Sequence, residues 1–331
     1  MKFISILSFA LLLISCNSKK EVSLSVAIEK ADAGLDSVVS STLQIQVLGT
    51  GYEWSEGPVW VESEKMLLFS DVPKNTIYKW TAEKGSEVYL TPSGYTGTTP
   101  RDGEGGSNGL TLNDEGDLIL CQHGDRRIAL MNTSTAQPTP EFTTIADRYE
   151  GKRFNSPNDV VFYNYDYYFT DPPYGLPQGT ADSSKEIPFQ GVYRATTNGK
   201  TILLIDSLTR PNGLAFMPGG KKLIVANSDP EKARWYEYTF NDSMQIVSGK
   251  ILYDATANAK TEKGLPDGLK IDSKGTIFGT GPGGVWIFNA DGKLLGKIKL
   301  QEATSNCALS TDEKALFVTN DMQVLKIQLR P

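Results

Sequence analysis

Ser107-Asn108-Gly109-Leu110-Thr111-Leu112 is one copy of a short motif that recurs along the chain. In each copy a polar residue, usually followed by glycine, precedes a short run in which apolar residues alternate with others. The other copies are Ser55–Trp60, Pro157–Phe162, Pro211–Phe216, Pro266–Ile271 and Ser305–Ser310. Their polar residues stand at 56, 108, 158, 212, 267 and 306, at intervals of 52, 50, 54, 55 and 39 residues. A repeat of about 50 residues that holds several strands is typical of a β-propeller.

The residues after each motif continue the strand pattern. In the second repeat an Asx- and Gly-containing turn at 113–117 leads into the apolar run 118–120, and a third run such as 284–288 follows in the fifth repeat. Such turns between β-forming residues are the sequence signal of hairpins. The sequence therefore predicts an all-β fold, a six-bladed β-propeller over residues 43–331. The sixth repeat is short, so we expect the strand at 43–48 to pair into the sixth blade and close the ring.

Composition excludes several classes of protein. The chain has 331 residues, 39 acidic and 33 basic, with a formal net charge of −6 and no basic block, which argues against a nucleic-acid partner. One histidine and three cysteines without a CxxC spacing exclude a His-rich zinc site, a zinc ribbon and a disulfide scaffold. Cys121 and Cys307 stand in strand-like runs, so we expect two buried free thiols. We also expect a monomer.

The sequence of the N-terminus indicates a targeting segment. Lys2 precedes an apolar stretch over 3–14, which predicts a signal peptide at residues 1–15. The end of this stretch, Leu13-Ile14-Ser15-Cys16, resembles a bacterial lipobox, in which the cysteine is lipidated. The alternative is an ordinary secretory signal cut near Ser15. Residues 16–42 are polar without sustained periodicity, so we expect a flexible tether and a cell-envelope protein anchored to the membrane by lipid on Cys16.

The repeat also predicts a site. Equivalent positions in successive blades lie at one height around the propeller axis, so the polar motif residues should ring one mouth of the central channel. They are Glu56, Asn108, Asn158, Asn212, Asp267 and Asn306. Carboxylate and amide oxygens are ligands for a hard cation, which favours one Ca²⁺ before Mg²⁺ or Mn²⁺, with Zn²⁺ a further possibility. The alternative is that these side chains only cap turns by bonding their own backbone.

Several of these motifs resemble those of a known family. The segments 55–60, 155–161, 169–175, 191–194, 210–216, 266–269 and 306–308 are similar to the gluconolactonase branch of the regucalcin (senescence marker protein)/gluconolactonase family. The resemblance runs from about residue 45 to 328. It implies a six-bladed propeller that holds a divalent cation in its channel and hydrolyses a sugar lactone such as glucono-1,5-lactone. It also implies Glu56, Asn158, Asn212 and Asp267 as the metal ligands.

Two other functions stay open at this point. Propellers of the diisopropylfluorophosphatase type use the same ligand pattern, so an organophosphate or aryl-ester hydrolase is an alternative. A non-enzymatic propeller that binds a sugar or a protein is another. For lactone hydrolysis a carboxylate must take a proton from water or attack directly, and Asp267 is the first candidate, followed by Glu56. The alternative is that Asp267 only holds the metal.

The remaining site candidates surround this ring. The Gly- and Thr-rich loop 91–107 is longer than a hairpin needs, so we expect a lid that carries Glu104 and Asn108 toward the substrate. Asn158 is expected to contact substrate as well. The resemblance includes a His-Gly pair followed by two arginines, which implies that His123 and Arg126 line the channel and bind substrate. A purely structural histidine is the alternative.

Overall fold

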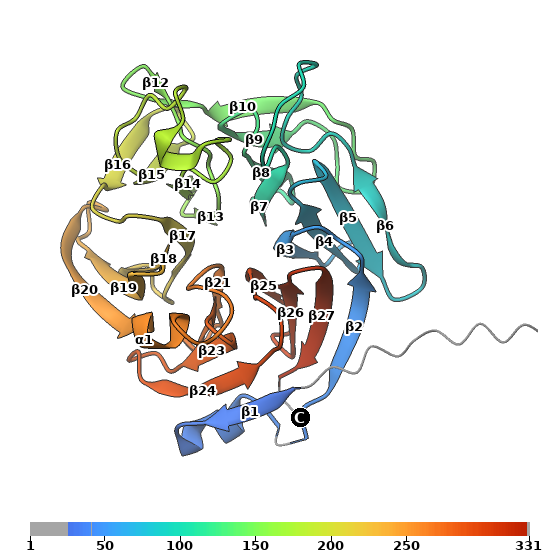
Figure 1. Cartoon of the computed structure of the whole chain (residues 1–331), viewed down its shortest axis with the longest axis vertical. Helices are drawn as coiled ribbons and strands as arrows, with labels where there is room; N and C mark the ends of the chain where they lie inside the picture. The colour runs from blue at the N-terminus through green and yellow to red at the C-terminus, as the bar shows by residue number, and fades with distance from the viewer. Residues whose placement is uncertain (1–25, 41, 330–331) are drawn as a thin grey trace, which may run out of the picture.

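The computed structural model describes residues 26–40 and 42–329 of the chain. The predicted signal peptide, Cys16 and the first part of the predicted tether lie outside the described residues. Six antiparallel sheets surround one central axis like the blades of a propeller (Figure 1). The predicted six-bladed, all-β fold is therefore confirmed.

Blades 1 to 3 are each a four-stranded meander whose first strand is innermost. Blade 1 contains β3 (Ser55–Val61), β4 (Met66–Asp71), β5 (Thr76–Thr81) and β6 (Gly85–Leu90). Blade 2 contains β7 (Ser107–Leu112), β8 (Leu118–Gln122), β9 (Arg127–Met131) and β10 (Phe142–Ala146). Blade 3 contains β13 (Val160–Tyr163), β14 (Asp166–Asp171), β15 (Gly191–Thr196) and β16 (Thr201–Ile205). The ribbon β11 (Arg148–Tyr149) and β12 (Lys152–Arg153) lies between blades 2 and 3 in the sequence.

Blades 4 and 5 follow the same plan. Blade 4 contains β17 (Pro211–Phe216), β18 (Lys222–Asp229), β19 (Lys232–Phe240) and β20 (Ile246–Asp254). Blade 5 contains β21 (Leu269–Ile271), β22 (Ile277–Gly281), β23 (Gly284–Phe288) and β24 (Leu294–Lys299). Among residues 26–40 and 42–329, three short helices lie outside the blades: η1 (Ala33–Ser37), η2 (Gly179–Ala181) and α1 (Thr256–Ala259). Within the described ranges, no helix is long and apolar enough to cross a bilayer.

The sixth blade closes the ring with a strand from the start of the domain. It contains β25 (Asn306–Leu309), β26 (Ala315–Asn320) and β27 (Gln323–Gln328), and its outer strand is β2 (Ile45–Thr50). Ile45 pairs with Ile327, and Thr50 pairs with Gln323. The predicted closure is confirmed, and β2 covers the outer edge of β27 at the point where the chain begins and ends its circuit.

The expectation of a flexible tether over residues 16–42 is wrong for the part that the structure describes. β1 (Ala27–Lys30) adds a fifth strand to the outer edge of blade 5, where Ala27 pairs with Lys299 (Figure 1). Leu35, Val38 and Val39 are then buried in the apolar cluster between blades 5 and 6. Only a few apolar residues in this polar stretch make these contacts. Their spacing shows no period because β1 has only four, mostly exposed residues and Leu35 lies in the short helix η1.

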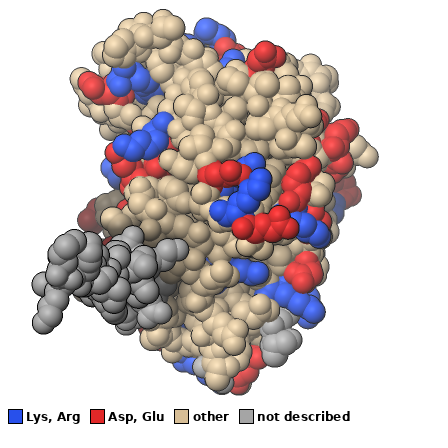
Figure 2. Space-filling model, turned by 90° about the vertical axis from the view of Figure 1, so that its right-hand side faces the viewer, with Lys and Arg blue, Asp and Glu red and all other residues tan. Residues whose placement is uncertain are grey.

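The core is divided among the junctions between blades. Six buried apolar clusters lie within the described chain, one between each pair of neighbouring blades. Cys121 and Cys307 belong to two of them as free, buried thiols, as predicted. On the face shown in Figure 2, basic and acidic side chains are intermixed. That face therefore carries no basic surface of the kind that nucleic acid requires.

Candidate active site at the mouth of the channel

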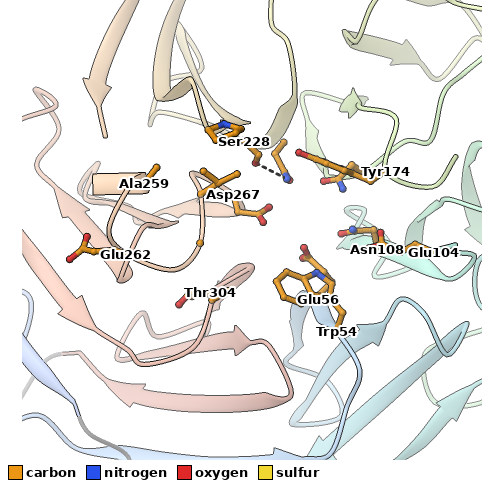
Figure 3. A pocket seen from close by; sticks show the side chains of 16 residues that line it. Trp54, Glu56, Glu104, Asn108, Tyr174, Ser228, Ala259, Glu262, Asp267 and Thr304 are labelled. Atoms are coloured by element: carbon orange, nitrogen blue, oxygen red, sulfur yellow. Dashed lines mark hydrogen bonds between the residues drawn. The ribbon is translucent and has the colours of Figure 1, made fainter. Parts of the chain in front are cut away.

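The repeated motif delivers its polar side chains to one cavity. Five of the six predicted ring residues line a cavity of about 470 Å³ at one end of the channel: Glu56, Asn108, Asn158, Asn212 and Asp267. Each stands at the start of the innermost strand of its blade or just before it. Figure 3 shows the carboxylates of Glu56 and Asp267 pointing into the same open space. The period of the sequence thus predicts this convergence correctly.

The glycine of the motif lets neighbouring copies approach closely. Gly57 has a φ of +49°, a conformation that favours glycine. A Cβ added to Gly57 would lie 2.0 Å from the backbone oxygen of Asn108, the next ring residue. The absence of a side chain at this position therefore brings the inner strands of blades 1 and 2, and their polar residues, together.

Several oxygens in this cavity lack partners. The Oδ1 atoms of Asn108, Asn158, Asn212 and Asp267 are buried, and each has no hydrogen-bond partner among residues 26–40 and 42–329. Buried polar atoms in folded proteins are nearly always paired. Four unpaired oxygens around one cavity therefore indicate a ligand that oxygen atoms coordinate.

The side-chain nitrogens of two of these amides contact neighbouring side chains. Asn212 donates through Nδ2 to the Ser228 hydroxyl at 3.0 Å. Asn158 places its Nδ2 atom 3.5 Å from His123 Nε2. Because these side chains engage the two nitrogens, the unpaired amide oxygens are the atoms left for a ligand in the cavity.

The carboxylates of the ring are electrostatically uncompensated. Burial raises the pKa of Glu56, and the nearby carboxylate of Asp159 raises it further. Burial also raises the pKa of Asp267, and the carboxylate of Glu56 adds to this rise. In the described part of the chain, no lysine or arginine lines the cavity. Two buried, mutually repelling carboxylates beside unpaired amide oxygens fit a hard divalent cation.

This donor set contains only two carboxylates. Within the described ranges there is no group of three or more His, Cys, Asp or Glu side chains that could hold a metal ion. A cation here would therefore need the amide oxygens of Asn158 and Asn212 as well as Glu56 and Asp267. Amide and carboxylate oxygens are ordinary ligands of Ca²⁺, whereas a zinc site is built mainly from imidazole and thiolate.

Glu104 lines the same cavity, as predicted, from the loop between β6 and β7. Other lining residues are not predicted by the repeat: Trp54, Tyr174, Ser228, Glu262 and Thr304 (Figure 3). Tyr174 belongs to the segment 169–175, whose motif already marked it. Ser228, near the end of β18, and Glu262, in the segment after α1, lie outside the repeated motif. The sequence therefore gives no signal for them.

Two predicted substrate contacts lie outside the cavity. Arg126 donates through Nε to the carbonyl of Phe154 at 2.6 Å and through Nη1 to the carbonyl of Ser184 at 3.0 Å. It fastens the blade 3 loops to blade 2, so its predicted role in substrate binding is corrected to a structural one. His123 is fully buried behind Asn158 and does not line the cavity. The prediction of a direct substrate contact is corrected for this residue too.

The sixth ring residue and the two neighbouring aspartates support the site from behind. Asn306 donates through Nδ2 to Asp159 at 3.3 Å and does not line the cavity. Asp171 accepts hydrogen bonds from the backbone N–H groups of Asn155 and Ser156, both at 2.8 Å. These bonds fix the turn that leads into Asn158.

Comparisons with known proteins agree with this site. The family model described as SMP-30/Gluconolactonase/LRE-like region matches residues 54–321. A gluconolactonase of Zymomonas mobilis is 36% identical over 310 residues, which cover 92% of this chain and 86% of the relative. A pentonolactonase of Haloferax volcanii is 26% identical over 280 residues, 83% of this chain and 84% of the relative.

A solved structure agrees as well. That of a gluconolactonase from Xanthomonas campestris superposes with a TM-score of 0.78 at 26% identity, over 91% of this chain and 94% of that one. The match of the family model extends from residue 54, before Glu56, to residue 321, just after β26 of blade 6, and so includes every ring residue. The chain therefore belongs to the SMP-30/gluconolactonase/LRE-like family.

Proposed function

We propose that this chain hydrolyses a neutral sugar lactone, such as glucono-1,5-lactone, in the cavity at the mouth of its channel. Relatives named gluconolactonase and pentonolactonase, which align over more than four-fifths of the chain, support the class of lactone hydrolase. The observation that carries the proposal is the convergence of four unpaired, buried oxygens, three from amides and one from Asp267, on a cavity that the carboxylate of Glu56 also lines. We include a divalent cation, Ca²⁺ first, held by Glu56, Asn158, Asn212 and Asp267.

When bound, such a cation would polarise the lactone carbonyl and stabilise the negative charge that develops on its oxygen. The chain's own part is proton transfer and orientation. Asp267 takes a proton from the attacking water, whose oxygen forms a bond to the carbonyl carbon. The ring C–O bond then breaks, the ring oxygen receives a proton, and the aldonic acid results. Glu56 is the second candidate for this proton transfer.

The cavity wall favours a sugar over an aryl ester. Asn108, Glu104, Ser228 and Thr304 offer donors and acceptors to hydroxyl groups. Trp54 supplies an indole ring, which also packs against the apolar face of a sugar. The wall thus combines groups for hydroxyls with apolar and aromatic surface from Trp54, Tyr174 and Leu265, and an organophosphate or aryl-ester substrate is the second candidate.

One experiment separates these possibilities. Initial rates are measured with hexono- and pentonolactones and with an aryl phosphotriester, before and after chelation and after return of Ca²⁺. We expect lactone turnover that chelator abolishes and Ca²⁺ restores, and little phosphotriester turnover. The variant Glu56→Gln removes a carboxylate ligand while keeping the side-chain size. We expect it to lower kcat/KM by more than about 100-fold. Lactonase turnover that ignores both chelator and this substitution would refute the proposed cation.

The proposal includes the cell envelope as the location. It rests on the basic Lys2, the apolar run 3–14 and the lipobox-like segment that ends at Cys16. Labelling cells with a radioactive fatty acid should label the chain, and Cys16→Ser should abolish the label. An unlabelled chain released into the soluble fraction would contradict the anchor.

A further inference from the structure

His123 is the single histidine of the sequence, and the proposed reaction gives it no role. Its side chain is completely buried. Its backbone N–H donates to the carbonyl of Gly106 at 3.1 Å. On the other side, a Cβ added to Gly175 would lie 2.7 Å from the His123 Cβ, so the chain packs closely against it. The imidazole is therefore held in one place behind the cavity wall.

The two ring nitrogens face two different cavity residues. His123 Nε2 lies 3.5 Å from Asn158 Nδ2. His123 Nδ1 lies 3.6 Å from a carboxylate oxygen of Glu104. Both Glu104 and Asn158 line the cavity, and they come from different blades. The imidazole is thus a bridge between them.

The chemistry of these contacts has one consistent direction. With the Asn158 amide in this orientation its nitrogen donates, so Nε2 of His123 is the acceptor and the ring hydrogen belongs on Nδ1. A carboxylate can only accept, so Glu104 favours a hydrogen on that same nitrogen. Among the described residues, His123 Nδ1 has no hydrogen-bond partner. The Glu104 side chain is 37% exposed, so rotation of its carboxylate is free to shorten the 3.6 Å gap.

We propose that His123 is a positioning residue that, oriented by Glu104, turns the oxygen of the Asn158 amide toward the cation. The inference rests on the proposed cation site. Without an acceptor behind it, the amide of Asn158 is free to rotate by half a turn and present its N–H groups to the cavity, where they would repel a cation. The Oδ1 atom that now faces the cavity is one of the four unpaired oxygens.

The other liganding amide is oriented by different means. Ser228 accepts from Asn212 and donates its own hydrogen to the carbonyl of Pro266. A hydroxyl that already donates elsewhere can only accept from the amide, so it also sets one orientation. Each of the two amides therefore has its own hydrogen-bond partner, the cavity-lining Ser228 for Asn212 and the fully buried His123 for Asn158.

The first test reads the ring directly. Because the chain contains one histidine, a long-range ¹H–¹⁵N spectrum of the full chain, made without a histidine tag, reports His123 alone. We expect the tautomer that carries its hydrogen on Nδ1. Glu104→Gln should raise the fraction with the hydrogen on Nε2. A wild-type ring protonated only on Nε2 would overturn the inference, whatever the cation does.

The second test measures Ca²⁺ affinity by calorimetry. His123→Leu removes the acceptor, and we expect affinity to fall by about 10- to 100-fold, the usual range for groups that orient metal ligands. His123→Gln keeps an acceptor oxygen and should recover most of that loss. Thermal unfolding without Ca²⁺ checks that each variant folds. Equal losses in the two variants, with both folded, would contradict the inference.

A double-mutant cycle separates orientation from charge. Removing the Glu104 carboxylate weakens attraction for a cation in any background, whereas its action through the imidazole needs His123. We therefore expect Glu104→Gln to cost more affinity in the wild type than in His123→Leu. Additive losses of Ca²⁺ affinity would show that Glu104 acts only through its charge and does not orient His123, which would contradict its part in the inference. A wild type that binds no Ca²⁺ at all would instead refute the proposed cation, and the spectrum would still decide the tautomer.

Discussion

The side-chain amide of Asn212 donates to the hydroxyl of Ser228 at 3.0 Å, and that hydroxyl donates to the carbonyl of Pro266, the residue before Asp267. One buried hydroxyl therefore connects a ring amide of blade 4 to the segment that carries a ring carboxylate of blade 5. Both side chains leave an unpaired oxygen facing the cavity. Ser228 thus fixes two of the four proposed ligands relative to each other.

Ser228→Ala should loosen both ligands at once. The substitution removes the acceptor of the Asn212 amide, so we expect Ca²⁺ affinity to fall by about tenfold or more. The free energy of unfolding should fall by about 1 kcal/mol, because only neutral hydrogen bonds are lost. Calorimetry with Ca²⁺ and urea unfolding measure the two effects. Ser228→Thr, which keeps the hydroxyl, is the control, and an affinity equal in Ala and Thr variants would contradict this role.

Gly57→Ala tests the close approach of neighbouring motifs. A methyl group at Gly57 would meet the Asn108 backbone oxygen at 2.0 Å, in addition to the cost of a φ of +49°. We expect the free energy of unfolding to fall by about 3 kcal/mol or more.

The matched control is Gly116→Ala. Gly116 also has a positive φ, +84°, but a Cβ there has no described atom within 4 Å. Only the backbone cost of about 1 kcal/mol applies to that variant. Similar losses in the two variants, measured by urea unfolding, would show that the contact between blades is unimportant.

The repeat predicts the fold and most of the site because both depend on the same periodic positions. Glu56 and Asp267 could be assigned to one cavity from their place in the motif alone, since a closed ring brings equal positions to one height. Arg126 could not be assigned in this way. Its partners are the carbonyls of Phe154 and Ser184, which belong to two separate loops of blade 3, before β13 and after β14, and neither residue belongs to the repeated motif.

The N-terminal strand could not be predicted for a related reason. β1 has only four residues and adds to the outer edge of blade 5, where Ala27, Glu29 and Lys30 are exposed, so it carries no clear alternation of apolar and polar residues. Leu35 and Val38 look like scattered apolar residues in a polar segment until the junction of blades 5 and 6 is formed beside them. The polar composition predicts an exposed segment, but the burial of a few apolar residues against blades 5 and 6 outweighs this tendency.

Leu35→Ala measures how much this segment stabilises the propeller. Leu35 is 2% exposed and packs against blades 5 and 6, so the truncation leaves a cavity. We expect the free energy of unfolding to fall by about 2 to 4 kcal/mol. Val88, which is 59% exposed on β6, provides the control Val88→Ala, for which we expect a change below about 0.5 kcal/mol. If Leu35→Ala leaves the free energy of unfolding unchanged, this segment acts as a tether and does not stabilise the propeller.

Glu262 gives stability a pH dependence. Burial by itself raises the pKa of Glu262, but hydrogen bonds from Lys299 and Lys297 outweigh it, and the net pKa is lower than the ordinary 4.5. A lowered carboxyl pKa stabilises the fold above the unfolded value, and this contribution is lost as the pH falls through the folded pKa. Glu262→Gln should therefore cost about 2 kcal/mol at pH 7, where it also leaves the buried Lys297 with the more distant Glu29.

The difference between wild type and Glu262→Gln should shrink when urea unfolding is repeated below pH 4.5. Asp242→Asn is the matched control, because Asp242 pairs with Lys221 at an exposed site. That variant should change stability by less than about 1 kcal/mol. A Glu262→Gln deficit that stays constant down to pH 3 would contradict the ion pairing.

The charge of the cavity predicts which lactones are poor substrates. Four carboxylates line it, those of Glu56, Glu104, Glu262 and Asp267, and the described lining includes no lysine or arginine. A divalent cation would compensate Glu56 and Asp267, and Lys297 and Lys299 compensate Glu262. Glu104 forms no ion pair with a lysine or arginine in the described chain, so we expect it to disfavour a phosphate group, which carries about −1.5 to −2 charges.

Glucono-1,5-lactone should therefore be hydrolysed with a kcat/KM at least about tenfold higher than its 6-phosphate, and added salt should reduce this preference. Glu104→Gln should narrow the ratio, because it removes the uncompensated charge without changing the size of the side chain. Equal rates on the two lactones at low salt would mean that a cationic group reaches the substrate from outside the described lining. The ratio between the two substrates is the informative quantity, because Glu104→Gln also acts on the cation through His123 and lowers both rates together.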